Sequence, residues 1–374
     1  MLGAEEVALE EGLGRVLAEE VRASGDVPPF DNSAMDGFAV TAGAAGRTLR
    51  IVGEARAGAP SPRPVAYGQA VRISTGAAVP AGTEAVVPVE QAQEADGLLR
   101  TTAAATAGAH VRRAGEDVRA GTVVLGAGTR LGAAQLGVAA SVGRATVRCR
   151  LVPRVAVLIT GDELRPPGAV LEPGQIHEAN GLTLGALAVQ AGARIVGRTY
   201  VPDDARATRD AVEAALEEAD VVVVSGGVSV GPHDHVKGAL GALGVNERFW
   251  GVALRPGKPT WFGTREATLV FGLPGNPVSA MVTFLLLARP ALLAQQGAPP
   301  HARRTGARLS ETLERLPGRD HAVRVRLDAE GRATPTGPQG SHQLTSMLHA
   351  NGLALVPAGE GELPAGTEVT VELF

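Results

Sequence analysis

The chain has 374 residues, of which 45% are apolar, 20% are charged and one is cysteine, with a formal net charge of −4. The chain is too long to fold around one compact core, so we expect several domains. Its weakly acidic net charge gives no general electrostatic reason to bind nucleic acid. The single Cys149 excludes an internal disulfide. The N-terminus lacks a signal-peptide core, and the longest apolar run (282–288) is too short to span a bilayer. We therefore expect a cytoplasmic protein without a membrane partner.

The first 150 residues predict two structural units. Apolar spacing predicts a helix over about 5–21, and a second helix over 131–142 that ends at Gly143. Between them the pattern changes to short strand-like pieces cut by Gly and Pro. We therefore expect a helical domain made of residues 1–24 and 124–149, with residues 25–123 as an inserted β domain.

From residue 154 the chain alternates between strands and helices. Strands are predicted over 154–160, 194–200, 221–224, 247–252 and 268–271, and helices over 180–191, 204–218, about 233–243, and 277–296. This alternation predicts a three-layer α/β domain (150–298) with a mostly parallel sheet. After Pro299 and Pro300 the remainder (299–374) has strand-like runs and Gly-rich turns, which indicate a small β barrel or sandwich.

Two loops of small residues follow predicted strands of the α/β domain. The first contains Ser225, Gly226, Gly227 and Ser229, directly after four valines. Glycine reaches positive φ, so successive N–H groups can converge on a phosphate or another oxyanion, although an ordinary strand-to-helix turn has the same composition. The second contains Pro274, Gly275, Asn276 and Pro277. Its Pro277 suits the first turn of a helix, and Gly275 and Asn276 tolerate left-handed backbone.

Charged residues stand beside these loops. Arg255 and Lys258 flank a Pro-Gly turn, where a guanidinium and an ammonium suit an oxyanion, and a solvated turn is the other interpretation. Acidic residues lie at or just after strand ends: Asp162, Glu163, Asp203, Asp204 and Asp234. Such acids near phosphate loops predict Mg²⁺, although Asp162 also suits a helix cap. The sequence offers no zinc cluster and no nucleophilic triad, which favours electrostatic positioning as the mechanism.

Several polar segments occur in one order: DNSAMDGFAV, ISTGAAVPAGTEAVVP, RRAGEDV, TGDEL, SGGVSVG, PGKP, GLPGNPVSA and GSHQL. Taken alone, each N-terminal segment is more typical of a structured turn than of a site. Together they make the whole chain resemble the MoeA/gephyrin E-domain family, the molybdopterin molybdenumtransferases. The resemblance implies an elongated homodimer of four-domain chains. The helical domain would serve dimerisation, and the partner's β domain would close over the molybdopterin-binding α/β domain.

The resemblance also implies a reaction, in which molybdate is inserted into adenylylated molybdopterin with Mg²⁺ and AMP is released. The pterin phosphate and nucleotide would be held by Ser225, Gly226, Gly227, Ser229, Pro274, Gly275, Asn276 and Pro277. Mg²⁺ or the pterin would be served by Asp234 and Glu163, with Asp203 or Asp204 joining them. Molybdate would be received by Arg255, Lys258, Arg324 and Ser341, and the partner subunit would contribute Asp36, Thr75 and Asp117. The catalytic set would be Asp36, Asp117, Glu163, Asp234 and Lys258.

The match has departures and leaves alternatives open. Pro232 stands where the family has an acid, His235 where it has a tyrosine, and Glu178 where an aspartate is common. The helix that many members carry before the segment equivalent to 7–21 is absent from this sequence. A related adenylyltransferase would make rather than consume adenylylated pterin, but the flanking β domains disfavour it. A gephyrin-like scaffold is the non-catalytic alternative, and other cofactor-biosynthesis proteins are conceivable partners.

Overall fold

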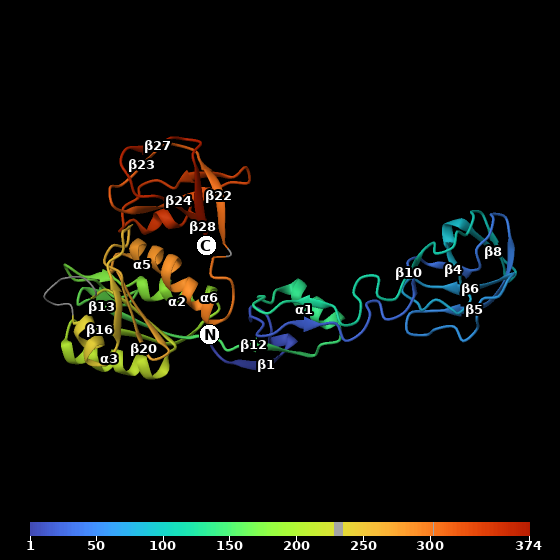
Figure 1. Cartoon of the computed structure of the whole chain (residues 1–374), viewed down its shortest axis with the longest axis horizontal. Coiled ribbons are helices and arrows are strands. Elements are labelled where there is room, and N and C mark those ends of the chain that lie inside the picture. Colours follow the sequence, from blue (N-terminus) through green and yellow to red (C-terminus); the bar gives the residue numbers. More distant parts are fainter. Residues whose placement is uncertain (228–234, 302) are drawn as a thin grey trace.

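A computed structural model describes residues 1–227, 235–301 and 303–374. The molecule is elongated (Figure 1). The α/β domain and the C-terminal barrel lie side by side at one end, a small N-terminal unit stands in the middle, and a β domain occupies the far end. Two connecting segments, on either side of the β domain in the sequence, run together from the middle unit to that far end.

The middle unit is built from both flanks of the β domain. Strand β1 (Ala4–Ala8) pairs antiparallel with β12 (Thr146–Arg150), and β2 (Val21–Arg22) pairs with β11 (Val123–Leu125). Helix α1 (Ala133–Ser141) covers them, and its presence confirms the helix predicted over 131–142. Their shared core is formed by Val7, Leu17, Val21, Leu131, Ala139, Val142, Val147 and Cys149.

The predicted helix over 5–21 is wrong. Only a 3-10 turn at Leu9–Glu11 is helical there, and the segment is otherwise strand and turn. Gly14 contributes to this outcome, because its φ of +77° is a left-handed conformation that ends a helix. The hydrogen bonds of strand 146–150, which lies far away in the sequence, then stabilise β1 as a strand.

The β domain is a six-stranded sheet with hydrophobic clusters on both faces. Its strand order is β7-β4-β6-β5-β9-β8. The strands are β4 (Gly37–Val40), β5 (Thr48–Ala55), β6 (Gln69–Ile73), β7 (Ala85–Pro88), β8 (Ala92–Ala95) and β9 (Leu98–Thr101). A separate two-residue ladder joins β3 (Asn32–Ser33) to β10 (Val111–Arg112).

The α/β domain has a six-stranded sheet in the order β16-β13-β17-β21-β20-β18. Four strands are parallel: β13 (Arg154–Thr160), β16 (Arg194–Val201), β17 (Val221–Ser225) and β21 (Thr268–Leu273). Two antiparallel strands, β20 (Trp261–Arg265) and β18 (Asn246–Trp250), complete one edge. The mostly parallel sheet confirms the prediction, whereas β20 has no counterpart in it.

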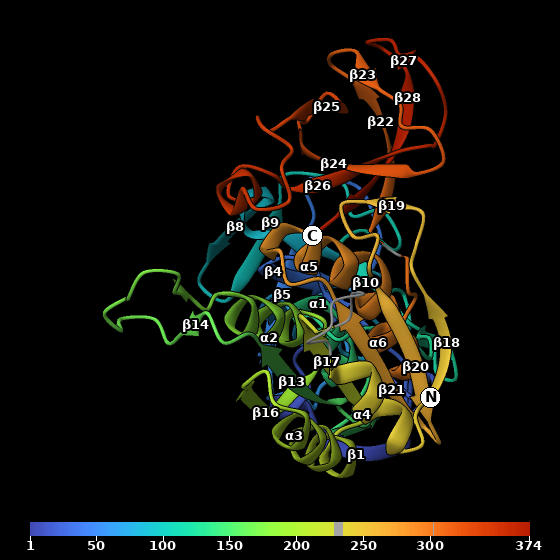
Figure 2. The same ribbon diagram turned by 90° about the vertical axis from the view of Figure 1, so that its left-hand side faces the viewer.

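Helices cover both faces of this sheet, which confirms the three layers (Figure 2). Helix α2 (Asn180–Gln190) and the long helix after β21 share one hydrophobic core with the sheet. Helices α3 (Ala205–Glu218) and α4 (Val236–Ala242) share the core on the other face. A short ladder of β14 (Leu164–Arg165) and β15 (Ile176–His177) carries a loop that projects from the domain.

The long helix consists of α5 (Pro277–Thr283), a π-helical turn (Phe284–Ala288) and α6 (Arg289–Gln295). It is the one helix of the described residues that is long and apolar enough to cross a membrane, and 56% of its most apolar stretch is buried. Val282, Phe284, Leu285 and Leu292 belong to the core of the α/β domain. The apolar composition therefore suits a core helix.

The C-terminal strands close into a barrel, as the sequence predicts. The ladders β24–β25, β25–β22, β22–β28, β28–β26 and β26–β24 form a complete circuit. The members are β22 (Arg304–Leu309), β24 (Asp320–Leu327), β25 (Arg332–Pro335), β26 (Gly352–Val356) and β28 (Glu368–Leu373), and β23 (Leu313–Glu314) pairs with β27 (Glu362–Leu363) beside them. A short strand of the α/β domain, β19 (Leu254–Arg255), pairs parallel with β24 and joins the two domains.

Candidate functional site

The predicted loops gather at one edge of the α/β sheet. Because β13, β16, β17 and β21 are parallel, the loops that follow them all leave from the carboxyl ends of the strands. Ligands bind at this edge in open α/β sheets. The edge therefore carries both small-residue loops and the carboxylates at 162–163 and 203–204.

The first loop has the backbone that its glycines predict. Gly226 and Gly227 have φ of +87° and +65°. A Cβ on Gly226 would lie 2.8 Å from Thr160 Oγ1, and one on Gly227 would lie 2.5 Å from Val236 Cγ2, so neither position accommodates a side chain. This part of the anion-loop prediction is confirmed. Ser229 and Asp234, which the sequence also assigns to the site, lie outside the described residues.

Asn180 fastens the two loops together, a role that the sequence reasoning missed. Its Nδ2 donates to Ser225 Oγ at 2.9 Å and to the carbonyl of Gly275 at 2.7 Å. The loops also touch directly, because a Cβ on Gly275 would lie 3.8 Å from Gly226 Cα. An asparagine at the first residue of a helix that starts at a sheet edge was the available signal.

The second loop does not adopt the left-handed backbone that the sequence analysis considered for Gly275 and Asn276. Asn276 has φ −62° and ψ 127°, and Gly275 is not among the residues with positive φ. The loop is extended, because Asn276 is the N-cap residue of α5 and Pro277 occupies its first turn. The asparagine side chain serves the site instead, since Nδ2 donates to Ser341 Oγ at 3.2 Å.

The acidic residues at this edge have different surroundings. Asp162 Oδ1 accepts from the N–H of Asp203 at 3.0 Å, which ties two loops together. Asp204 is the N-cap of α3 and accepts from the N–H of Ala207 at 2.8 Å. The Glu163 carboxylate folds over Gly161. Within the described ranges no three acidic, histidine or cysteine side chains form a metal-binding cluster.

A cavity of about 410 Å³ lies between the α/β domain and the barrel. Three cations line it: Arg255, Lys258 and Arg319. Its lining also includes Ser341 and Asn276, and it contains no acidic residue of the described chain. The predicted molybdate residues Arg255, Lys258 and Ser341 are thus brought together. Arg319 was missed because it lies in a Pro-Gly turn of the barrel with no neighbouring motif. A cavity with this charge suits a small oxyanion.

Pairing between domains positions the cationic turn. In the β19–β24 ladder Arg255 lies opposite His321. The following Gly257 has φ +126°, and a Cβ there would lie 2.4 Å from Thr283 Cγ2, so the turn sits tightly against α5. Lys258 is thereby presented beside the start of that helix.

The structure places Arg324 behind the cavity lining. The side chain is fully buried, and its Nη2 donates to the carbonyls of Pro338 and Gly340, at 3.0 and 3.2 Å. Its Nε donates to Ser346 Oγ at 2.8 Å. Arg324 therefore holds the loop that presents Ser341.

Positive charge beside the cavity is incompletely compensated. Arg324 Nη1 and His321 Nε2 are buried without a hydrogen-bond partner in the described part of the chain. Burial and then the charge of Arg255 lower the pKa of Arg324 to about 10. Burial, Arg255 and Arg324 lower the pKa of His321 to about 4. An anion entering beside Arg255 would relieve this repulsion.

The pH dependence of stability should report His321. Its pKa is depressed on folding, so the unfolded chain binds a proton that the folded chain excludes. The stabilisation is complete above about pH 6.5, decreases as the pH falls from there, and is gone below about pH 4. We expect urea unfolding to show a loss of about 2 kcal/mol between pH 7 and pH 5 from this group. His321→Gln should flatten that part of the profile, and an identical pH slope in the variant would refute the assignment.

The residues predicted to come from a partner lie away from this edge. Asp36 Oδ1 accepts from the N–H of Thr75 at 2.7 Å, so these two exposed residues of the β domain adjoin. Asp117 is exposed in the connecting segments, where its N–H donates to the carbonyl of Val27 at 3.0 Å. Within one chain the β domain stands at the opposite end from the α/β loops (Figure 1).

Comparison with known proteins matches three family models along the chain. They are described as the MoeA N-terminal region, domains I and II (residues 1–143), a probable molybdopterin binding domain (156–294) and the MoeA C-terminal region, domain IV (306–374). The middle match defines the class: proteins built around a molybdopterin-binding α/β domain. Its span coincides with the sheet that carries the loops.

Individual relatives cover the chain almost end to end. Molybdopterin molybdenumtransferase of Haemophilus influenzae is 37% identical, across 98% of this chain and 93% of its own length. Molybdopterin molybdenumtransferase 2 of Mycobacterium tuberculosis is 38% identical, across 98% and 94%. The crystal structure of the MoeA protein from Pyrococcus horikoshii OT3 superimposes with a TM-score of 0.85 at 29% identity, covering 100% of this chain and 95% of that one. The chain belongs to the MoeA family.

Proposed function

We propose that this protein is a molybdopterin molybdenumtransferase, which inserts molybdate into adenylylated molybdopterin and releases AMP. The observation that carries the proposal is the cavity lined by Arg255, Lys258 and Arg319 without an acidic residue of the described chain, next to the small-residue loops. The cations suit molybdate as substrate, and the N–H groups around Gly226 and Gly227 suit the pterin phosphate. Asn180 hydrogen-bonds to Ser225 in the first loop and to Gly275 in the second loop, and so holds the two loops together.

Mg²⁺ would bind at the same edge through one or two carboxylates together with substrate phosphates, since the described acids form no three-ligand cluster by themselves. We assign the cation to the carboxylates of Glu163 and Asp203, with Asp234 as a further candidate, because Mg²⁺ prefers carboxylate oxygens and shares them with substrate phosphates. Asp162 supports this arrangement by fixing the Asp203 loop. Asp204 already serves as a helix cap through one oxygen, which makes it the weaker ligand. When bound, the cation would neutralise charge on the phosphates.

The experiment that tests the reaction measures AMP released from adenylylated molybdopterin by the full chain. With Mg²⁺ present, we expect release to depend on molybdate and to saturate with it. Release that is indifferent to molybdate would refute the transferase. Synthesis of adenylylated pterin from ATP would instead identify an adenylyltransferase, and tight pterin binding without AMP release would favour a scaffold.

We further propose a homodimer in which each β domain completes the site of the other subunit. The support is that the β domain, which carries the exposed Asp36 and Thr75, stands at the opposite end of the chain from the α/β domain (Figure 1). A second copy is the simplest source of those residues at the α/β edge.

Mixing two inactive variants tests this arrangement. Asp36→Ala and Lys258→Ala should each be inactive, whereas a mixture unfolded and refolded together should recover about a quarter of wild-type AMP release, because half of the dimers are mixed and each has one intact site. A mixture of Asp36→Ala with Asp117→Ala is the matched control and should recover nothing, since both its sites stay defective. Absence of recovery in the first mixture would place each site within one chain.

A further inference from the structure

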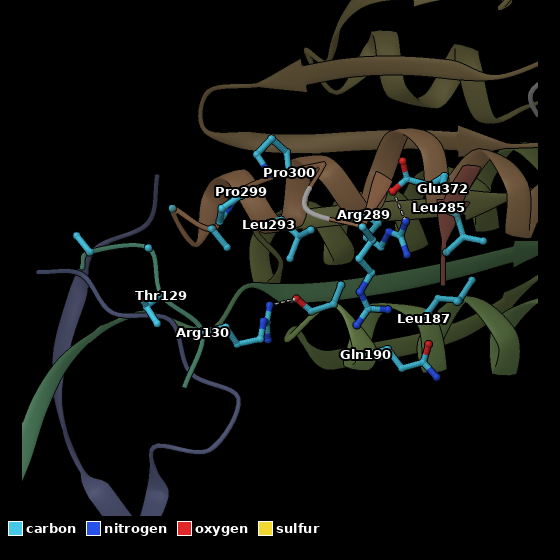
Figure 3. Close-up of a pocket in the computed structure, with 16 residues that line it drawn as sticks. Thr129, Arg130, Leu187, Gln190, Leu285, Arg289, Leu293, Pro299, Pro300 and Glu372 are labelled. Carbon is cyan, nitrogen blue, oxygen red and sulfur yellow. Dashed lines mark hydrogen bonds and ion pairs between the residues drawn. The ribbon is translucent and has the colours of Figure 1, made fainter. Parts of the chain in front are cut away.

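A second cavity lies at the junction of three parts of the molecule (Figure 3). Its volume is about 510 Å³, within the range of about 300–1,000 Å³ that ligand pockets occupy. Thr129 and Arg130 of the middle unit form one side, α2 and α6 form another, and Glu372 of the barrel closes it. The long helix (277–295) separates it from the cavity lined by Arg255, Lys258 and Arg319. Ser279 near the start of that helix lines the first cavity, and Leu293 near its end lines the second.

The lining combines apolar walls with unbalanced positive charge. Apolar side chains of both helices and the linker, among them Leu187, Leu293 and Pro299, cover much of the wall. The charged members of the lining are Arg130, Arg289, Arg303 and Glu372.

Glu372 is already engaged by two arginines. Its Oε1 accepts from Arg289 Nη2 at 2.5 Å and its Oε2 accepts from Arg304 Nε at 2.7 Å. Both carboxylate oxygens are therefore occupied by cations other than Arg130 and Arg303. The single acid of the lining cannot neutralise those two.

Among the described residues, neither Arg130 nor Arg303 has an acidic partner. Arg130 is half-buried and donates only to main-chain carbonyls, those of Gly14 at 2.8 Å and Ala191 at 3.0 Å. The exposed side chain of Arg303 makes no ion pair or hydrogen bond with any described residue. Both side chains line the same cavity, and burial, followed by the charge of Arg303, lowers the pKa of Arg130. The half-buried Arg130 is partly removed from water, so an anion that joins the two guanidiniums would offset part of that cost.

We propose that this cavity is a binding site for a small amphipathic anion, with a carboxylate or phosphate head held by Arg130 and Arg303 and an apolar body against Leu187 and Leu293. Guanidinium groups form bidentate hydrogen bonds with carboxylates and phosphates, and contact with the leucines removes the apolar body of the ligand from water. Because Arg130 belongs to the middle unit while Arg303 begins the barrel, an occupant would fix these parts relative to each other. The proposal is independent of the molybdenum chemistry.

Calorimetric titration of the full chain tests the site, with octanoate and octyl phosphate as probes. We expect saturable binding, one equivalent per chain, by at least one of the two probes. The neutral octanamide, which has the same chain and no charge, should bind at least tenfold more weakly. Molybdate should not compete with the probe. No saturable binding, equal binding of octanamide, or displacement by molybdate would each overturn the proposal.

Variants locate the binding. Arg303→Gln should raise the Kd of the probe about tenfold while preserving the fold, because this side chain is exposed and has no described partner. Arg308→Gln, an exposed arginine of the same strand region outside the cavity, is the matched control and should change the Kd less than about twofold. Leu293→Trp should abolish binding by filling the cavity. Equal Kd values for the Arg303 and Arg308 variants would place the probe elsewhere.

Discussion

Replacing Arg255 by glutamine should lower molybdate-dependent AMP release roughly 100-fold, the usual cost of removing one preorganised charge donor from an oxyanion site. The same change should leave the protein at least as stable as before. Arg255 lowers the pKa of both His321 and Arg324 through its charge, so its removal relieves repulsion in the resting protein. Kinetics with varied molybdate, together with urea unfolding at pH 5, would measure both effects.

The matched control is Arg326→Gln, which removes an exposed arginine from the same barrel strand that pairs with β19. Its activity and stability should stay close to those of the wild type. If Arg255→Gln retains full molybdate-dependent turnover, the cationic cavity is not the entry point for molybdate. If the variant loses turnover only because it unfolds, the repulsion argument is wrong.

Replacing Gly226 by alanine should weaken binding of adenylylated molybdopterin by about two orders of magnitude, because the main-chain amides that grip the phosphate would be displaced. Its φ of +87° costs an alanine about 1–2 kcal/mol, and the added Cβ would lie 2.8 Å from Thr160 Oγ1 and 2.9 Å from Thr160 O. Equilibrium binding of the substrate, measured by fluorescence titration, reports the loss.

Gly168 provides the control for this substitution. It has nearly the same φ, +88°, but a Cβ there meets no atom within 4 Å. Gly168→Ala should therefore show the conformational cost in its stability and keep its substrate affinity. Equal affinities for the two variants would show that the loop around Gly226 does not hold the substrate.

The sequence predicted best where local patterns carry the fold. Runs of β-branched residues alternating with amphipathic segments predicted the α/β domain, and alternating strands with Gly turns predicted the barrel. The Gly226 and Gly227 conformations followed from composition as well. These features depend on residues that are close along the chain, where periodicity and turn chemistry are informative.

The misses depend on partners that are distant along the chain. The apolar spacing over 5–21 resembled a helix, but Gly14 breaks it and strand 146–150 supplies hydrogen bonds that no local pattern reveals. Strand β20 was missed because Trp261–Arg265 is short and follows a Pro-rich turn. Asn180 and Arg319 join the site through contacts between loops that are far apart in sequence. The loop-holding contacts of Arg324 are of the same long-range kind, and its predicted contact with molybdate stays a prediction.

The ladder between β19 and β24 also limits how the enzyme can move. Main-chain hydrogen bonds cross the border between the α/β domain and the barrel. Moving the barrel away from the α/β domain would break these bonds at Arg255. The pairing therefore stiffens that border, and in the proposed reaction molybdate would enter a cavity whose two sides are tied together. Truncation after residue 298 would remove β24, the pairing partner of β19, and with it the barrel side of the cavity.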